Sequence, residues 1–193
     1  MPNSSLTTDI AQGAFCGPNV NVGKTLSDVY IIPLLDLDQS ATTFNASDEC
    51  IIESLSMTAG GSRAYKYSAV SGSIVTNANI VQKDSFNDKY SHDATFALTD
   101  NTSATRREIG KLLREDVAIA YQKSNGDITV MGYHAGMRLS GDFIFNEGGE
   151  NASEVSPILA TRTGDEPNEG YTLFITDAAT SLAVLEGLLT PTA

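Results

Sequence analysis

Tryptophan is absent from this sequence of 193 residues, and basic side chains are scarce. The 12 Lys and Arg residues are outnumbered by 24 Asp and Glu residues, which gives a formal net charge of −12 at pH 7. No basic cluster is longer than Arg106-Arg107, whereas docking onto nucleic acid requires a concentrated basic face that neutralises phosphates. The composition therefore argues against nucleic-acid binding as the primary activity.

Long hydrophobic runs are missing as well. Residues 1–5 lack the basic and apolar regions of a secretory signal, and no stretch reaches the roughly 18 apolar residues of a membrane span. We therefore expect a soluble chain made in the cytosol, with no membrane partner. In such a chain two cysteines, Cys16 and Cys50, are more often small buried hydrophobes than a disulfide.

The sequence does contain enough apolar material for a hydrophobic core. Hydrophobic residues make up 41% and charged residues 19%, which is typical of a folded chain. The length fits one large domain, or one domain with a long arm. Residues 1–27 are rich in Ser, Thr, Asn and Gly and indicate an extended N-terminal arm that needs a neighbour to order it. Residues 28–193 are expected to form a single β-rich domain.

Strand patterns dominate the first half of this domain. Residues 29–37 have strand composition, but Pro33 lacks an N–H, which predicts an edge strand or a bulged one. Residues 38–49 carry polar turn formers and predict an exposed loop. From 50 to 98 the apolar residues mostly recur with a period of two, which predicts several half-buried antiparallel strands.

One of these strands is expected to have an apolar and a polar side. In the strand expected near residue 93, apolar residues occupy even-numbered positions: Tyr90, Ala94, Phe96 and Leu98. Polar residues occupy odd-numbered positions, among them Ser91, Asp93 and Thr95. Because successive side chains of a strand point to opposite faces, the second set should face water or a polar channel.

The second half of the domain contains one clear helix and one clear hairpin. The helix is expected at 102–115, where Ile109, Leu112 and Leu113 share a face. The pair Asn125-Gly126 predicts a hairpin turn, because both central residues of the favoured turn need positive φ. Leucine spacing at 178–189 fits either a docked C-terminal helix or a tail that packs on a neighbour. Further strands are expected at 117–123, 128–134, 136–145, 155–162 and 171–176.

Sequence signals for catalysis or for a cofactor are weak. Residues 17–25 resemble a phosphate-binding loop, but five residues rather than four separate the glycines and no buried strand leads into it. His92 and His134 have no second ligand at metal-binding spacing. Carboxylate pairs such as Glu166 and Glu169 are expected by chance in so acidic a chain. We therefore expect no enzyme activity, no cofactor and no bound metal.

The second half also presents a series of short elements in a fixed order. They are a helix at 102–115, a strand at 117–123, the turn Asn125-Gly126, a strand ending in Val130-Met131-Gly132-Tyr133, Gly136-Met137-Arg138-Leu139, a Gly-rich excursion, Gly164-Asp165 and Gly170-Tyr171-Thr172-Leu173. This order resembles the C-terminal half of tail tube proteins of long-tailed bacteriophages. The resemblance covers about ninety residues. The chain departs from the family where it extends past Thr176-Asp177 into an apolar tail.

The resemblance implies a mainly β fold: an antiparallel β-sandwich or open barrel flanked by one α-helix. It implies a self-assembling structural protein of the virion, whose six-membered rings stack into a hollow tail tube for DNA ejection. Expected partners are other copies of the chain, other phage tail or neck proteins, and DNA only in transit. Ser91, Asp93 and Thr95 are candidates for the face that lines the channel, because an acidic and hydroxyl wall does not grip DNA.

Contacts between subunits are expected where segments have few partners within one subunit. The candidates are Val20, Val22 and Leu26 in the arm region, together with Phe44 in the loop at 38–49. Two alternatives stay open at this point. One is a neck-ring or tail-completion protein of the same fold, and the other is a monomeric β-sandwich module that binds glycans or acts as an adhesin. The missing tryptophan weighs against a sugar-binding platform.

Overall fold

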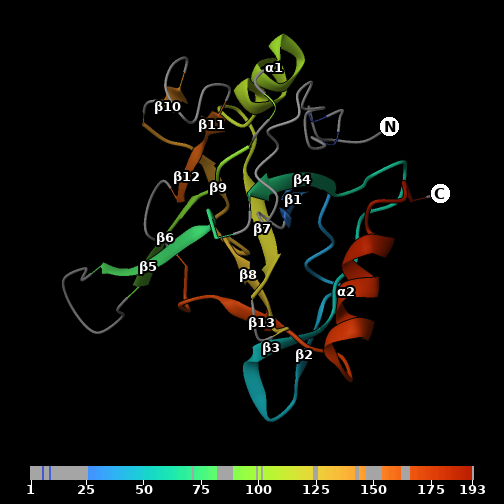
Figure 1. The fold of residues 1–193 in the computed structure, drawn as a ribbon. Coiled ribbons are helices and arrows are strands. Elements are labelled where there is room, and N and C mark those ends of the chain that lie inside the picture. The colour runs from blue at the N-terminus through green and yellow to red at the C-terminus, as the bar shows by residue number, and fades with distance from the viewer. Residues whose placement is uncertain are drawn as a thin grey trace.

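The computed structural model describes Leu6, Asp9 and residues 26–70, 72–81, 89–98, 100, 102–123, 126–141, 144–146, 154–161 and 166–192. These residues form a mainly β fold with two helices (Figure 1). The strands are β1 (Leu26–Pro33), β2 (Thr43–Asn45), β3 (Asp48–Ser54), β4 (Tyr65–Val70), β5 (Val75–Val81), β6 (Lys89–Thr95), β7 (Val117–Gln122), β8 (Ile128–Met131), β9 (Met137–Leu139), β10 (Ile144–Asn146), β11 (Glu154–Ser156), β12 (Ile158–Thr161) and β13 (Tyr171–Leu173). The helices are α1 (Ser103–Lys111) and α2 (Ala178–Gly187).

Most of the strands belong to one large sheet, in the order β2-β3-β13-β8-β7-β9-β12-β6-β5. Strand β1 joins this sheet by pairing with β7, and β4 pairs with the other edge of β1. Strands β10 and β11 form a separate two-stranded ladder. The pairings between these strands are antiparallel, except that β3 runs parallel to β13. The arrangement confirms the sandwich or open-barrel class expected from the sequence.

Strand β1 lies in the interior of the sheet rather than at its edge. Tyr30, for example, is opposite Lys66 on β4 and opposite Ala120 on β7. Pro33 is the last residue of β1, opposite Val117, so its missing N–H falls where the strand ends. The edge or bulged position predicted from Pro33 is therefore wrong, because a terminal proline leaves the pairing of the preceding residues intact.

Two hydrophobic cores lie on opposite sides of β1 and β7. The α1-side core is formed by residues of β1, β4, β6, β7, β9, β12 and α1. The α2-side core is formed by residues of β1, β3, β7, β8, β13 and α2. Alternate residues of β1 serve the two cores, with Val29 and Ile31 on one side and Tyr30 and Ile32 on the other. Because both faces of β1 are buried from Val29 to Ile32, this part of the strand is a continuous apolar run.

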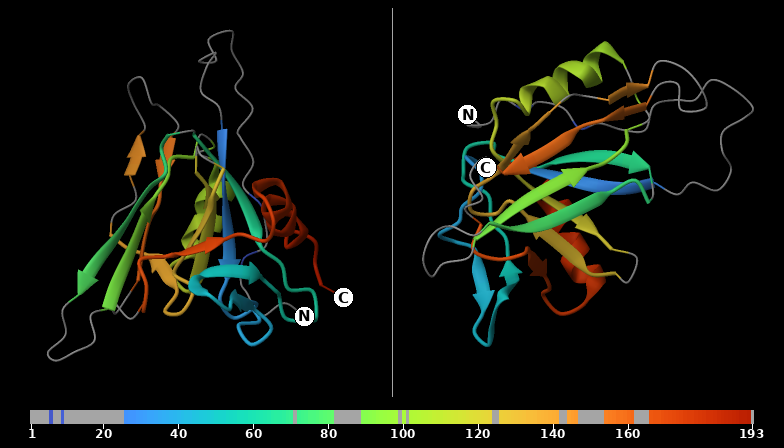
Figure 2. Two further views of the ribbon diagram at one scale, coloured as in Figure 1. Left: turned by 90° about the horizontal axis from the view of Figure 1, so that it is seen from below. Right: turned by 90° about the vertical axis from the view of Figure 1, so that its left-hand side faces the viewer.

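The strands around the α1-side core close at one end. An isolated bridge joins Ala69 of β4 to Leu98, and the Val70 N–H donates to the Ala97 carbonyl at 2.9 Å. Hydrogen bonds therefore run from β4 through β1, β7, β9, β12 and β6 back to β4. From this closure β5 and β6 slant away from β1 (Figure 2). The barrel is thus closed at one end and open along β5.

Helix α1 packs against the α1-side core and is shorter than the sequence predicted. The Thr102 hydroxyl caps it by accepting a hydrogen bond from the Thr105 N–H. Ile109 and Leu112 are buried as expected, but Leu113 is 53% exposed. The helix ends before Leu112, so Leu113 no longer lies on the apolar face that a longer helix would give it.

The end of the chain forms a docked helix, which is one of the two outcomes left open by the sequence. The Asp177 carboxylate caps α2 by accepting the Thr180 N–H at 2.7 Å. Leu185 and Leu188 pack into the α2-side core. No helix in the described ranges is long and apolar enough to cross a membrane.

The segment 38–49, predicted as an exposed loop, contains part of a β-hairpin. Its first residues do form a turn, in which the Asp38 carboxylate accepts the N–H groups of Ser40 and Ala41. Strand β2 follows and pairs with β3. The sequence missed β2 because three residues are too few to show a strand period.

Two residues of the predicted N-terminal arm contact β4 of the same subunit. Leu6 is 1% exposed, and its carbonyl oxygen accepts a hydrogen bond from the Tyr65 hydroxyl. The Asp9 carboxylate accepts the Lys66 N–H at 2.8 Å. This carboxylate therefore satisfies a backbone donor on the outer edge of β4, which protects that edge from pairing with another chain.

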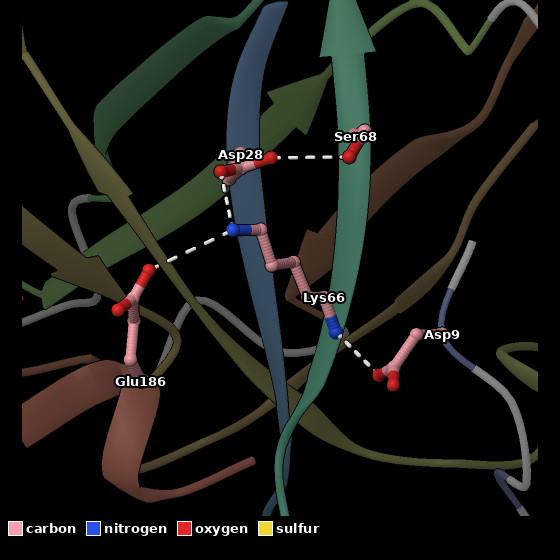
Figure 3. Close-up of polar contacts among 5 residues, drawn as sticks. All are labelled: Asp9, Asp28, Lys66, Ser68 and Glu186. Atoms are coloured by element: carbon pink, nitrogen blue, oxygen red, sulfur yellow. Dashed lines mark hydrogen bonds and ion pairs between the residues drawn. The ribbon is translucent and has the colours of Figure 1, made fainter. Parts of the chain in front are cut away.

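The Lys66 side chain joins two further parts of the fold (Figure 3). Its ammonium group lies 2.7 Å from the Asp28 carboxylate on β1 and 3.8 Å from the Glu186 carboxylate on α2. The hydrogen bond to Asp28 is the largest cause of a raised Lys66 pKa. Asp28 also accepts a hydrogen bond from the Ser68 hydroxyl. One cation thus links the β1–β4 ladder to the C-terminal helix.

Candidate assembly surface

Apart from the β4 edge that Asp9 covers, the large sheet has two ends where a strand of another chain could pair. One end is β2 and the other is β5, and each pairs with a single neighbouring strand among the described residues. An edge strand presents unpaired N–H and C=O groups. Proteins protect such edges with short strands, bulges, charged side chains or proline. These protective features distinguish the two ends.

The β2 end carries the features that protect an edge. Strand β2 has three residues, and its register with β3 shifts on both sides of Phe44. The Asn45 side-chain oxygen accepts the N–H groups of Ser47 and Asp48, which closes the turn into β3. So short and irregular a strand offers little backbone to a partner.

The β5 end lacks all of these features. Strand β5 spans seven residues and pairs with β6 in unbroken register from Val75 to Val81. The sequence from 67 to 82, which includes β5, contains no proline and no Asp, Glu, Lys or Arg. Val75 and Ile80 are 56% and 63% exposed. A long, regular and uncharged edge with exposed apolar side chains favours the addition of another strand.

A groove of about 540 Å³ runs beside β5. Residues 76–79 of β5 line one side, and residues of β7, β8 and β13, such as Tyr121, Thr129 and Thr172, line the other. Four consecutive residues of β5 take part, although successive side chains of a strand point to opposite faces. The groove therefore follows the edge of β5 and is not confined to one face of the strand.

Hydrogen bonds hold the β5–β6 hairpin beside the groove. The Thr76 hydroxyl on β5 lies 2.6 Å from the Tyr121 hydroxyl on β7. The Asn79 amide donates to the Asp93 carboxylate on β6 at 2.7 Å. The charged residues in the lining are Lys123 and Glu169, one of each sign. Hydroxyl, amide and backbone groups therefore dominate the groove, and these groups suit the main chain of an extended peptide.

The three residues predicted to line a channel lie together on one face of β6. Ser91, Asp93 and Thr95 are half-buried, whereas His92 and Ala94 on the opposite face are buried. The alternation expected for this strand is therefore confirmed. Strand β6 lies one position in from the β5 edge, so these side chains would belong to any sheet extended from that edge. Their position in a channel stays a prediction.

Of the four residues predicted to contact other subunits, Val20 and Val22 lie outside the described residues. Leu26 is the first residue of β1 and pairs with β4, but its side chain is also outside the described part of the structure. Phe44 is half-buried within its own subunit. A role of these residues between subunits stays a prediction.

Phe44 belongs to an aromatic cluster that fastens the β2 end to the body of the fold. Its ring centroid lies 5.7 Å from that of Tyr133 and 5.4 Å from that of Tyr171. The Tyr133 and Tyr171 centroids are 5.4 Å apart. Each ring meets the others at a steep angle, which is a favourable geometry for aromatic pairs. The hairpin β2–β3 is thus packed onto β8 and β13 by side chains as well as by backbone hydrogen bonds.

A buried carboxylate supports the same region. Glu166 is fully buried, and its side chain accepts the N–H groups of His134 at 3.0 Å and Ala135 at 2.7 Å. The His134 Nε2 atom lies 2.6 Å from the Tyr171 hydroxyl. Burial, and secondly the Glu166 charge, raises the pKa of Tyr171 to about 12. Burial lowers the pKa of His134, against the opposing effect of Glu166.

The remaining candidates for chemistry have structural roles. His92 is buried, its Nδ1 accepts the Gly132 N–H, and its Nε2 donates to the Asn168 carbonyl. No group of three or more His, Cys, Asp or Glu residues that could hold a metal ion occurs in the part of the chain that the structure describes. The segment 17–25 lies outside that part.

Sequence reasoning recognised the strands around β5 but not their exposed edge. The available signal was the uncharged and proline-free run at 67–82, since edge strands usually carry such protective residues. The groove could not be found from sequence, because it brings β5 next to β8 and β13. Comparison of the chain with protein-family models, with curated proteins and with solved structures found no match.

Proposed function

We propose that this chain is the subunit of a bacteriophage tail tube, a structural virion protein without enzyme activity. Its copies assemble into rings, six to a ring in the family that the sequence resembles, and the rings stack around a channel for DNA. The observation that carries the proposal is the β5 edge. Within the described residues the large sheet ends in a long, uncharged strand that pairs on one side only.

An unprotected edge gives the subunits a way to join. When each copy adds strands to the sheet of its neighbour in a head-to-tail contact, the shared sheet loses its edges if the rotation between copies closes a ring. A closed sheet with many strands is too wide for side chains to fill its interior. Such a ring would be hollow.

The charge of the chain supports a conduit for DNA. At −12 per copy, a ring of six carries a formal charge of −72, which outer and inner surfaces share. DNA phosphates are repelled by such a wall, so the DNA slides through without being held. Ser91, Asp93 and Thr95 present hydroxyl and carboxylate groups on a strand next to the joining edge. They are the residues we assign to the channel face.

The groove favours a second candidate, a monomeric module that binds a glycan. Its hydroxyl and amide groups, such as those of Thr76, Asn77 and Thr129, could bind sugar hydroxyls. Sugar sites also use exposed aromatic rings, however, and the tyrosines of this groove, Tyr121 and Tyr171, are buried. A neck-ring protein of the same fold would use the same edge and differ only in how many rings stack.

The oligomeric state of the purified chain tests the proposal. We expect light scattering after size-exclusion chromatography to show a concentration-dependent assembly, and negative-stain electron microscopy to show annular particles or striated tubes. Single rings that never stack would favour a neck-ring protein. A compact monomer at every concentration that retains glycans on an array would overturn the proposal and favour the binding module.

A further inference from the structure

We infer that the outer face of helix α1 binds an acidic segment of another protein, and that this segment crosses the helix at Gly110. The face includes Arg107, Gly110 and Arg114, whose spacing of three and four residues places them on one side of a helix. Helix α1 lies at the end of the body away from β2 and β3, and apart from β5 (Figure 1). The inference therefore goes beyond the proposed assembly of copies and does not depend on it.

The helical turn continues past the end of α1 as far as Arg114. The N–H groups of Leu112, Leu113 and Arg114 donate to carbonyl oxygens three residues earlier, which is the bonding of a 3₁₀ turn. Ile109 and Leu112 pack into the α1-side core. Arg114 is exposed and extends the solvent side of the helix.

The first argument is the separation of charge on α1. The chain has twice as many acidic as basic residues, yet the segment 106–114 contains four of its 12 basic residues. The two acids nearest to them along the chain, Glu108 and Glu115, are only 4% and 7% exposed. Arg107 and Arg114 are exposed and form no ion pair with the residues that the structure describes. The solvent side of α1 is therefore basic, which favours an acidic partner.

The second argument is the glycine in the middle of this face. Glycine inside a helix is less stable than alanine, so it usually has a packing or functional reason. A Cβ atom added to Gly110 meets no other atom within 4 Å, and the residue has ordinary helical backbone. The packing of the subunit thus does not require glycine here. A missing side chain instead gives another molecule room to approach the helix backbone closely.

The third argument distinguishes a protein from other acidic partners. Nucleic acid is bound by surfaces that contact many phosphates, whereas this face is only about 12 Å long and belongs to a chain of net charge −12. A membrane requires a wide apolar face on the helix, but Ile109 and Leu112 are buried in the core. Arginines beside the exposed Leu113 are typical of a contact between proteins.

A second copy of the chain is a poorer partner than another protein. Each copy carries −12, so two copies repel each other through their whole surfaces, and the short face of α1 would have to offset this repulsion. A protein that is acidic only in the segment that crosses α1 keeps the local attraction without the repulsion.

The charge is tested with the full chain and a labelled peptide of Glu and Ala residues as the acidic probe. Fluorescence anisotropy measures binding at low ionic strength, where exposed charges are least screened. We expect Arg107→Gln and Arg114→Gln each to weaken binding by about fivefold, the upper range for one exposed ion pair. Lys123→Gln removes one exposed positive charge elsewhere and should change binding by less than about twofold.

The close approach is tested separately by Gly110→Gln. Glutamine is a better helix former than glycine, and its side chain would extend into open space, so we expect a higher Tm for the isolated chain. The same side chain would obstruct the crossing segment and should weaken probe binding by about fivefold or more. Ala104→Gln, at another exposed residue of α1, is the control and should bind within about twofold of the wild type. A glycine with a structural role only would not give higher stability together with weaker binding.

The other outcomes overturn the inference. Failure of the probe to bind, or equal weakening by Lys123→Gln and Arg107→Gln, would leave no specific acidic contact on α1. Unchanged binding in Gly110→Gln would show that no segment crosses the helix there. Tighter binding of duplex DNA or of phosphatidylserine vesicles would identify a different class of partner. Self-association that is lost in Arg107→Gln would identify a second copy as the partner.

Discussion

The β2 end and the β5 end of the large sheet are held to the body in different ways. At the β2 end, Phe44 packs on Tyr133 and Tyr171. The Glu166 carboxylate holds the turn that follows Tyr133, while the Glu166 backbone pairs with Tyr90 of β6. At the β5 end, the hairpin is connected across the groove by the hydroxyl pair of Thr76 and Tyr121. The first end is covered by side chains of its own subunit, whereas β5 has a neighbouring strand on one side only among the described residues.

This difference suggests a division of roles within one sheet. Side-chain packing at the β2 end stabilises the isolated subunit, whereas β5 pairs on one side only among the described residues and has exposed side chains at Val75 and Ile80. Changes at the first end should therefore lower the free energy of unfolding. Changes at the second should leave the isolated subunit stable and alter its association. The following experiments test this contrast, all in dilute solution where association is negligible.

The largest effect is expected from Glu166→Ala. The change leaves the part-buried N–H groups of His134 and Ala135 without their charged acceptor and should lower the free energy of unfolding by about 3 kcal/mol. Urea-induced unfolding measures the loss. Glu169→Ala, at an exposed neighbouring carboxylate, is the matched control and should stay within about 0.5 kcal/mol. Equal effects at the two sites would show that Glu166 does not support this end.

A second experiment compares the two ends directly with the same type of truncation. Phe44→Ala removes a ring of the aromatic cluster and should cost about 2 kcal/mol, less than for a fully buried phenylalanine. Ile80→Ala, at a side chain that is 63% exposed, should change stability by less than about 0.5 kcal/mol. The contrast between the ends fails if the isoleucine change costs as much as the phenylalanine change.

A smaller effect is expected for the hydrogen bond that connects the β5 end to β7. The single variants Thr76→Val and Tyr121→Phe each remove one of the two hydroxyls. A double-mutant cycle from urea unfolding should give a coupling energy of about 1 kcal/mol. A coupling near zero would mean that this hydrogen bond does not help to hold β5 against β7.

The smallest effect concerns pH and His134. Burial lowers the His134 pKa in the folded protein, so protonation below the ordinary histidine pKa of about 6.5 favours the unfolded chain. The stability linked to this residue is therefore complete above about pH 6.5 and falls as the pH drops through the folded-state pKa. The variant His134→Gln should show a shallower loss of stability between about pH 7 and pH 5. Identical slopes for the two proteins would exclude this histidine as a source of the pH dependence.

Local patterns allowed much of the fold to be predicted from the sequence. The period of two around Asp93 and the hairpin predicted from Asn125-Gly126 both agree with the structure. Each depends on residues close together in the chain. The edge position inferred from Pro33 was wrong because a proline at a strand end and one within a strand look alike in sequence.

The candidate assembly surface was less accessible to sequence reasoning. Ser91, Asp93 and Thr95 were placed on one face correctly because strand parity is a local property. The groove depends on which strands become neighbours. Periodicity does not predict that β3 pairs with β13 or that β12 pairs with β6. Phe44 was expected to be available to other subunits, but its neighbours Tyr133 and Tyr171 lie far along the chain.

The parallel pairing of β3 with β13 has a consequence for biosynthesis. In the described sheet, β13 is the strand that joins the β2–β3 hairpin to β8. The hairpin leaves the ribosome early, but it has no place in the sheet until residues 171–173 have been translated. Pairings between such distant segments make folding slow. The subunit therefore completes this sheet only after residues 171–173 have been translated, and a nascent chain interrupted before that point would expose both Phe44 and Ile52 to aggregation.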